Sequence, residues 1–210
     1  MSMHHKILMF FYPIFIIIRK FGIMLQIITP NRLRVLIYHD IPAVEEVNFE
    51  AQMRWLTKHW NIVSPSEFEA IMLGKTPLIG DNLLITFDDG LISNRVVAEK
   101  ILNPLGIKAI FFVISDFVKI ETPLASRQFI AKYIIPNSKL SDIPEAWRNM
   151  QLSDLSALIE QGHTIGYHTK LHSRLSDCTT GSELEDELIS SSKCFSTQLG
   201  KDINHFAYTF

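Results

Sequence analysis

Two adjacent carboxylates, Asp88 and Asp89, follow directly on the apolar run Leu83–Phe87 and precede Gly90. A short apolar run bounded by turn residues is typical of a buried parallel strand. Because successive side chains of a strand point to opposite faces, both carboxylates can approach one site only if the chain turns there, and a glycine permits such a turn. The pair indicates either a site at the end of a strand or a loop that begins with solvated acids.

Two histidines, His168 and His172, form the second group of residues that could do chemistry. His168 ends another predicted strand, and His172 lies four residues further on, beyond the turn. Paired imidazoles and one carboxylate are a common ligand set for a divalent metal, and imidazole favours zinc or a similar ion. Two histidines at this spacing also occur by chance. Both pairs, however, lie at the carboxyl ends of predicted parallel strands, which meet at one end of a sheet.

The elements that must position these residues alternate between strand and helix, which predicts an α/β fold with a parallel sheet and outer helices. The pattern does not decide between an open sheet and a barrel. Predicted N-caps are Asn48, Ser66 and Ser182, the last in a capping box with Glu185. The long connection 115–150 suggests a functional loop or an insertion. The predicted strands are 34–39, 61–63, 82–87, 108–114, 163–168 and 203–210, and the predicted helices are 48–60, 66–74, 93–102, 126–133, 152–161 and 182–199.

The composition is that of an ordinary globular protein. Of the 210 residues 47% are hydrophobic and 20% are charged, with a formal net charge of −2. Such balanced charge lacks the basic surface of a nucleic-acid-binding protein, so we expect no nucleic-acid partner. Cys178 and Cys194 have neither metal-site nor disulfide-framework spacing, which is consistent with free thiols in a reducing compartment.

The first 30 residues form a separate segment in our interpretation. Two apolar stretches, 7–18 and 21–28, are separated by Arg19 and Lys20. Each stretch is shorter than the roughly 20 residues that span a bilayer. Joining them would bury two cations, at a cost of roughly 2.5–3.5 kcal/mol each. We therefore favour membrane association through residues 7–28, in a cytoplasmic or membrane-associated protein. The alternatives are a cleaved signal peptide, although no small-residue cleavage site follows, and a translation start placed too early.

The two motifs together resemble one family. Thr86–Gly90 reads TFDDG and His168–His172 fits H-[ST]-x-x-H, as in the polysaccharide deacetylases, also called the NodB homology domain or carbohydrate esterase family 4. The similarity extends over residues 33 to 210, so residues 31–210 are interpreted as the deacetylase domain. The resemblance implies a distorted (β/α) barrel of the NodB type. It also implies a hydrolase that removes N-acetyl or O-acetyl groups from a polysaccharide or amino-sugar glycan.

The resemblance further implies a role for each matched residue. Asp89, His168 and His172 would bind a divalent metal, preferably zinc, and leave positions open for water and a substrate carbonyl. Asp88 would be the general base that takes a proton from the water. The backbone N–H of Phe210, together with the metal, would stabilise the oxyanion formed from the acyl group.

The sequence departs from the family pattern near residue 210. Phe206–Phe210 resembles a third motif, F-A-Y-P-[FY]-G, in which Ala207 stands where other members carry an arginine and Thr209 replaces a proline. A further acidic motif and a Leu-x-His motif, whose histidine acts as general acid, are absent. We therefore expect a barrel that is incomplete at the C-terminus and a domain that binds metal with weak or no turnover.

Other interpretations remain open at this stage. One is a truncated, catalytically weak or inactive deacetylase-like protein that keeps the metal site. Another is a phosphoacceptor domain built on the acid pair, although such a domain has no use for the two motif histidines. Among the remaining histidines, His39 at the end of the first strand is the best additional site candidate, whereas His59, His163 and His205 are expected to be structural or exposed.

Overall fold

The computed structural model describes residue 17 and residues 31–209 of the chain. The predicted N-terminal segment 1–30 therefore lies, except for one residue, outside the described residues, as does Phe210. Within the described part, no helix is both long and apolar enough to cross a lipid bilayer.

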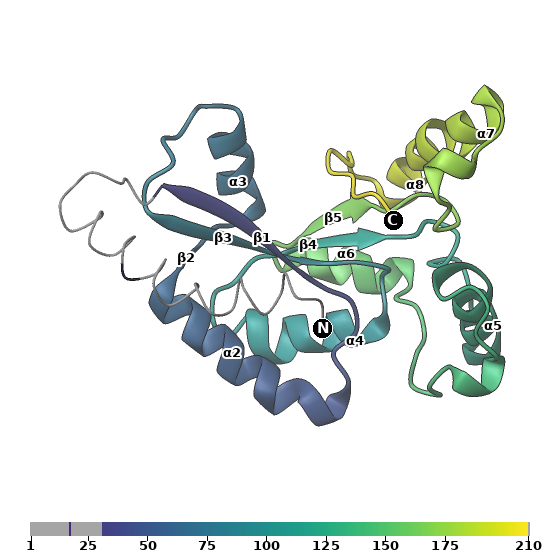
Figure 1. Ribbon diagram of the computed structural model, residues 1–210, viewed down its shortest axis with the longest axis horizontal. Coiled ribbons are helices and arrows are strands. Elements are labelled where there is room, and N and C mark those ends of the chain that lie inside the picture. Colours follow the sequence, from purple (N-terminus) through teal and green to yellow (C-terminus); the bar gives the residue numbers. More distant parts are fainter. Residues whose placement is uncertain (1–16, 18–30, 210) are drawn as a thin grey trace.

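A five-stranded parallel sheet forms the centre of the molecule (Figure 1), in the order β1-β3-β4-β5 with β2 also paired to β3. The first strand, β1 (Arg32–Tyr38), pairs with β3 (Asp81–Phe87) over its whole length. The other edge of β3 is shared, because β2 (Asn61–Ile62) pairs with its first half and β4 (Ile110–Val113) with its end. The strand β5 (Thr164–Tyr167) follows beside β4. The predicted α/β fold with a parallel sheet is confirmed.

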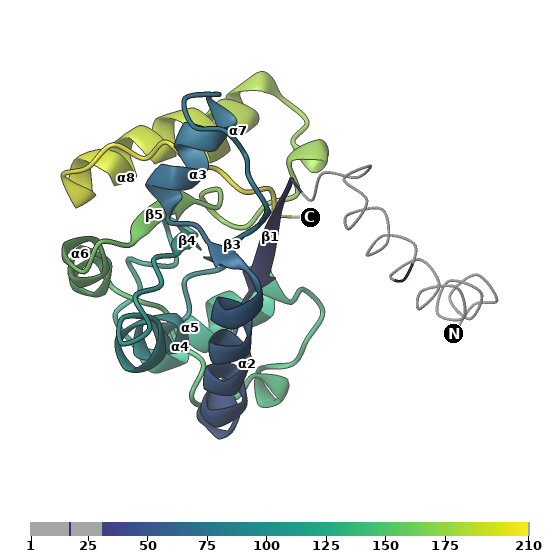
Figure 2. The same cartoon turned by 90° about the vertical axis from the view of Figure 1, so that its left-hand side faces the viewer.

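Helices cover both faces of this sheet. Figure 1 shows α2, α4 and α6 on one face and α3 on the other, and Figure 2 shows the same separation from the side. Three helices continue into π-helical turns: α4 into Ala98–Leu102, α5 into Ile130–Ile134, and α7 into Asp186–Ser190, which leads into α8. The helices are α2 (Glu46–His59), α3 (Pro65–Met72), α4 (Ile92–Val97), α5 (Pro123–Phe129), α6 (Leu152–Glu160), α7 (Gly181–Glu185) and α8 (Ser191–Leu199).

The central strands are buried on both faces, which explains their uninterrupted apolar sequences. On one face Phe87 of β3 stacks on Phe111 of β4, with ring centroids 5.0 Å apart, in the large core beneath α2, α4, α6 and α8. On the other face Leu84 and Phe112 belong to a smaller core, against which Phe68 of α3 packs. The alternation of side chains along each strand therefore supplies both cores at once.

The connection between β4 and β5 is more ordered than predicted. It contains α5, a π-helical turn and the short 3₁₀ turn Leu140–Asp142. Phe117 and Phe129 stack with their ring centroids 4.9 Å apart, in a separate buried cluster with Ile114 and Ile143. This segment thus has its own small hydrophobic core and forms a folded unit beside the sheet.

Two of the predicted N-caps are wrong, by three residues at α2 and by two residues at α3. Asn48 lies inside α2, because the 3₁₀ turn Ala43–Glu45 begins the helical path earlier. Ser66 is likewise not a cap, because Ser64 forms the capping box of α3 with Glu67. Proline is favoured in the first helical turn, so the proline that follows Ser64 favours the earlier start.

The start of α7 shows the same kind of error. Thr180 caps this helix in a capping box with Glu183, so the predicted box of Ser182 with Glu185 is wrong. Both pairs satisfy the S/T-x-x-E pattern, and the earlier one begins the helix. The predicted helical extent to Leu199 is confirmed.

The predicted strand 203–210 is reduced, among the described residues, to a single parallel bridge between Tyr167 and Phe206. The backbone N–H of Tyr167 donates to the carbonyl of His205 at 2.8 Å, and the N–H of Ala207 donates to the carbonyl of Tyr167 at 3.1 Å. The segment then departs from the strand path, because the Thr209 hydroxyl donates to the carbonyl of Ser173 at 2.7 Å. This contact directs the end of the described chain towards the loop that follows β5.

Candidate metal centre

The chain turns sharply where β3 ends at the two carboxylates. The N–H of Asp88 still donates to the carbonyl of Tyr38 at 2.9 Å, so this residue continues the pairing with β1. Asp89 and Gly90 then both adopt left-handed backbone conformations, with φ of 71° and 82°. A Cβ atom on Gly90 would lie 3.0 Å from Cγ1 of Val113, so a side chain fits poorly there. The predicted turn is confirmed, and it includes the second aspartate itself.

The two histidines are brought together by a second left-handed turn. The N–H of His168 donates to the carbonyl of Val113 at 3.0 Å, which places His168 directly after β5 beside the end of β4. Thr169 and His172 then have positive φ angles of 63° and 64°. Asp and His are enriched among the few non-glycine residues that adopt this conformation, whereas a β-branched threonine is an outlier. The imidazole rings of the two histidines end with their centroids 5.2 Å apart.

Asp89, His168 and His172 are all buried and converge on one point. Oδ1 of Asp89 lies 3.6 Å from Nε2 of His168 and 3.4 Å from Nε2 of His172, and this oxygen has no hydrogen-bond partner. Three ligand atoms at about 2.1 Å from a tetrahedral ion are separated from one another by about 3.4 Å. A buried carboxylate oxygen without a partner is costly, and this set of atoms fits a divalent cation.

Both imidazoles are oriented by backbone carbonyls from distant segments. Nδ1 of His168 lies 3.0 Å from the carbonyl oxygen of Ala207, and Nδ1 of His172 lies 3.1 Å from that of Tyr133. A carbonyl only accepts hydrogen bonds, so each Nδ1 carries the proton and each Nε2 keeps its lone pair for a ligand. Burial also lowers the pKa of His168 to about 4, which keeps this ring in its neutral, metal-binding form.

Asp88 lies beside the three converging side chains but is not one of them. Burial raises the pKa of its carboxyl to about 6; the charge of His39 opposes that rise, and the charge of Asp89 adds to it. Burial likewise raises the pKa of Asp89, against the lowering effect of His172. A carboxyl whose pKa lies close to neutrality suits proton transfer, which is the property that a general base at Asp88 would need.

A cavity of about 290 Å³ gives access to this centre. Its polar lining includes His39, Asp40 and Thr209 beside Asp89 and His172. The rest of its wall is apolar and comes mostly from the folded connection between β4 and β5. That wall is lined by Leu91, Ile130, Ile134, Ile135 and Trp147.

Asp40 and Trp147, two of the lining residues, form a contact that the sequence did not predict. The indole N–H of Trp147 donates to Oδ2 of Asp40 at 2.7 Å, and the hydroxyl of Ser93 donates to Oδ1 of Asp40 at 2.6 Å. This bridge fixes the rim of the cavity between β1 and the connection. Asp40 directly follows the site candidate His39, but no sequence pattern indicates that Trp147, more than 100 residues away, is its partner.

The remaining predicted residues are placed as follows. His39 lines the cavity, whereas Phe210 lies beyond the described chain. The other three histidines are away from the centre, as expected: His59 stacks on a tryptophan, His163 accepts the N–H of Ala109, and His205 lies 2.7 Å from Glu69. A larger cavity of about 450 Å³ is lined by residues between 173 and 187, four of which are carboxylates and none of which is a histidine.

The sequence is similar to those of known proteins. The sequence profile of the polysaccharide deacetylase family matches residues 75–210. The protein YxkH of Bacillus subtilis (strain 168), whose name places it among the polysaccharide deacetylases, is 25% identical over 146 residues. That alignment covers 62% of this chain and 52% of YxkH, so the chain spans about half the length of this curated relative.

Solved structures share the fold. IcaB from Ammonifex degensii superposes with a TM-score of 0.67 at 22% identity, over 86% of this chain and 75% of IcaB. The Streptococcus pyogenes deacetylase PplD gives 0.63 at 20% identity, again over 86% and 75%. A de-N-acetylase from Aggregatibacter actinomycetemcomitans gives 0.62 at 19% identity, over 85% and 79%. The predicted NodB-type architecture, with an incomplete barrel, is confirmed. With a family profile that matches well over half of its length, the chain belongs to the polysaccharide deacetylase family.

Proposed function

We propose that this protein is a metal-dependent hydrolase that removes acetyl groups from an N-acetylated polysaccharide or amino-sugar glycan. The observation that carries the proposal is the buried, unpartnered Oδ1 of Asp89, which faces Nε2 of both His168 and His172. The two imidazoles are already held in the tautomer that a cation requires. O-acetyl groups are an alternative target of the same chemistry.

The reaction breaks an amide C–N bond, releases acetate and leaves an amine on the sugar. A divalent cation held by Asp89, His168 and His172, with zinc preferred by this ligand set, would polarise the acyl carbonyl and activate water. Asp88 then serves as the general base that removes a proton from the attacking water. The apolar wall of the cavity limits the access of bulk water to the reacting group. The N–H of Phe210 remains our predicted oxyanion donor.

The leaving amine also needs a proton, and His39 is our candidate donor. It lies on the cavity wall, and its charge acts on both aspartates. We expect His39→Asn to lower the rate of acetate release by about 10²-fold or more, because general acid catalysis typically contributes 10²–10⁴-fold. Zinc affinity, measured by calorimetry, should stay unchanged. His59→Asn is the matched control, since His59 is exposed and stacks on Trp55 away from the cavity. An unchanged rate in His39→Asn would exclude this donor.

The alternative is an inactive deacetylase-like protein that retains the metal site. We further propose that residues 1–30 associate with a membrane and residues 31–210 form the deacetylase domain, in a cytoplasmic or membrane-associated protein. Fluorescence microscopy of the tagged chain, with and without residues 1–30, tests that division.

Metal binding and turnover separate the two functions. The purified chain is titrated with Zn²⁺ by calorimetry, and acetate release from an N-acetylglucosamine tetramer is followed in an enzyme-coupled assay. We expect one zinc per chain, and acetate release that EDTA abolishes and added zinc restores. Zinc binding without acetate release from any N- or O-acetylated glycan would favour the inactive protein. A chain that binds no divalent metal would contradict both interpretations.

A further inference from the structure

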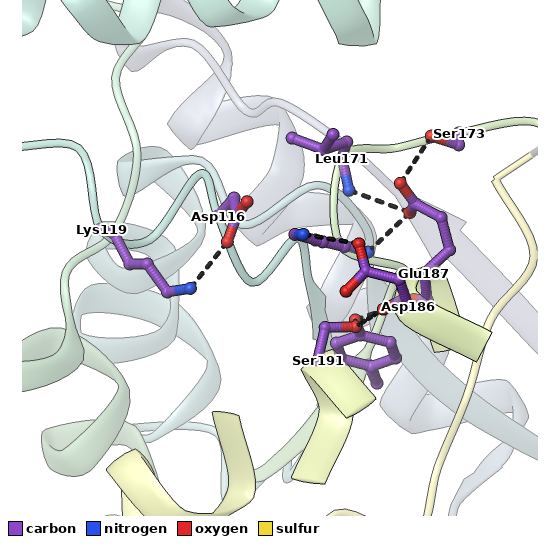
Figure 3. A network of polar contacts seen from close by, with 9 residues as sticks. Asp116, Lys119, Leu171, Ser173, Asp186, Glu187 and Ser191 are labelled. Carbon is purple, nitrogen blue, oxygen red and sulfur yellow. Dashed lines mark hydrogen bonds and ion pairs between the residues drawn. The ribbon is translucent and has the colours of Figure 1, made fainter. Parts of the chain in front are cut away.

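A buried carboxylate outside the metal centre, that of Glu187, makes all its hydrogen bonds to the loop that carries the two histidines (Figure 3). Glu187 lies in the π-helical turn Asp186–Ser190 between α7 and α8, and its exposure is 7%. It is not one of the three converging ligands. Neither sequence motif includes it.

The bonds of this carboxylate are specific. Oε2 accepts the backbone N–H groups of Lys170 at 3.0 Å and of Leu171 at 3.1 Å, and Oε1 accepts the hydroxyl of Ser173 at 2.9 Å. Lys170 and Leu171 lie between the two histidines, and Ser173 follows the second. A charged acceptor forms stronger hydrogen bonds with N–H groups than a neutral one does. Glu187 therefore holds the loop on both sides of His172.

The loop needs such support because its backbone is unusual. Thr169 and His172, on either side of the two bonded N–H groups, have left-handed φ angles of 63° and 64°. Non-glycine residues keep this conformation only where the surrounding structure enforces it. Without Glu187, the N–H groups of Lys170 and Leu171 would lose their acceptor, and the turn that directs His172 towards Asp89 would lose part of its support.

Glu187 is itself fixed from the sheet side. The hydroxyl of Tyr167 donates to the backbone carbonyl of Glu187 at 2.9 Å. Tyr167 ends β5 and directly precedes His168. Glu187 is therefore hydrogen-bonded both to the end of β5 and to the loop that follows it. Asp186, the residue before Glu187, is not buried in this way. Its side chain is 55% exposed and forms an ion pair with the ammonium group of Lys170, at 2.7 Å. An ion pair as exposed as this one contributes little.

We infer that Glu187 is a positioning residue of the metal centre. Through the backbone of Lys170 and Leu171 it sets the direction of the His172 imidazole, although it touches neither the metal nor the substrate. This inference rests on the proposed metal-dependent function. It adds a residue from α7–α8 to a centre whose ligands all come from the ends of β3 and β5.

Three variants test the inference. Glu187→Ala removes every acceptor. Glu187→Gln keeps an oxygen for the two N–H groups, and Ser173 can then accept from the amide instead of donating. Asp186→Ala is the matched control, because it removes an adjacent acid that contacts the same loop only through a side chain. Zn²⁺ affinity is measured by calorimetry, the geometry of the centre by the visible spectrum of the Co²⁺-loaded protein, and loop order by amide hydrogen exchange at Lys170 and Leu171.

We expect Glu187→Ala to weaken zinc affinity about 10–100-fold, the usual effect of losing an outer partner of a metal centre. Its cobalt spectrum should change, and its two loop amides should exchange faster. Glu187→Gln should restore affinity to within about threefold of wild type, and Asp186→Ala should match wild type. If Glu187→Ala does not fold, Glu187→Asp replaces it, because the shorter side chain keeps the charge but does not reach the loop.

Wild-type zinc affinity and wild-type amide protection in Glu187→Ala, or in Glu187→Asp as its substitute, would overturn the inference. So would an equal loss in Glu187→Gln and Glu187→Ala, because the charge would then matter rather than the positioning bonds. Failure of the proposed function has a different signature, since the wild-type chain itself would bind no zinc. In that case amide exchange alone decides whether Glu187 orders the loop.

Discussion

Replacing Asp89 by alanine is expected to abolish zinc binding and, with it, acetate release. Asp89 supplies the unpartnered buried oxygen that faces both imidazoles, at 3.6 and 3.4 Å. Without it the site keeps two neutral nitrogens and loses the negative charge that balances a dication. His172→Ala should have a similarly large effect, because it removes the ligand closest to that oxygen. Calorimetric titration with Zn²⁺ and metal analysis of the purified variants measure the loss.

The control for these variants is His59→Ala, which removes an exposed imidazole from α2 and should bind zinc like wild type. Circular dichroism establishes that each variant is folded. Removal of the carboxylate relieves an unfavourably buried charge in the absence of metal, so the metal-free Asp89→Ala protein should be no less stable than metal-free wild type. Full zinc affinity in Asp89→Ala would show that the cation, if any, binds elsewhere.

Replacing Asp88 by asparagine is expected to lower the rate of acetate release by about 10²–10⁴-fold, the usual contribution of a general base. Asparagine has nearly the same size, so the pairing of this residue with Tyr38 through its backbone N–H should persist. Zinc affinity should change by no more than about threefold, because Asp88 is not one of the three converging side chains. The readouts are acetate release at saturating zinc and calorimetry on the same preparation.

The Asp88→Asn and Asp89→Ala variants therefore serve as controls for each other. Asp88→Asn should lose turnover and keep the metal, whereas Asp89→Ala should lose both. If Asp88→Asn also lost zinc, the pair would act as one ligand unit, and the division of tasks between base and ligand would be wrong. An Asp88→Asn variant that releases acetate at the wild-type rate would place the base on another residue.

Local sequence patterns predict the centre of the sheet well because its central strands are short, apolar and buried on both faces. The three converging side chains could be predicted in the same way, because the carboxyl ends of all strands in a parallel sheet lie at the same edge. The hydrogen bonds that orient the two imidazoles could not be predicted from local sequence patterns. The carbonyls of Tyr133 and Ala207 act through backbone atoms, which leave no trace in the residue type. Glu187 looks, in sequence, like any acid of an amphipathic helix, and only its burial distinguishes it.

The starts of the helices were predicted less well than the sheet. The sequence offers two overlapping capping patterns at α7, and the pattern alone does not say which one begins the helix. No residue of α7 is buried, and the earlier pattern is stabilised by the Glu183 carboxylate, which accepts the N–H groups of Thr179 and Thr180. The cavity wall was also not predicted. Ile130 and Ile134 have the spacing of an ordinary core face, and Ile130 does belong to the core of its own segment. Their second task, lining the cavity, follows only from the way that the connection folds back over the sheet.

The two carbonyls that orient the imidazoles lie at equal distances along the chain, 39 residues before His172 and 39 residues after His168. Each contact closes a long loop, so both imidazoles are held in place only when the connection before β5 and the segment after α8 have docked. A ligand that binds only the assembled state adds its binding free energy to folding, about 4 kcal/mol at a thousandfold excess over its dissociation constant. Metal binding at this centre would therefore be linked to the folding of both segments, since each segment supplies the carbonyl that orients one imidazole.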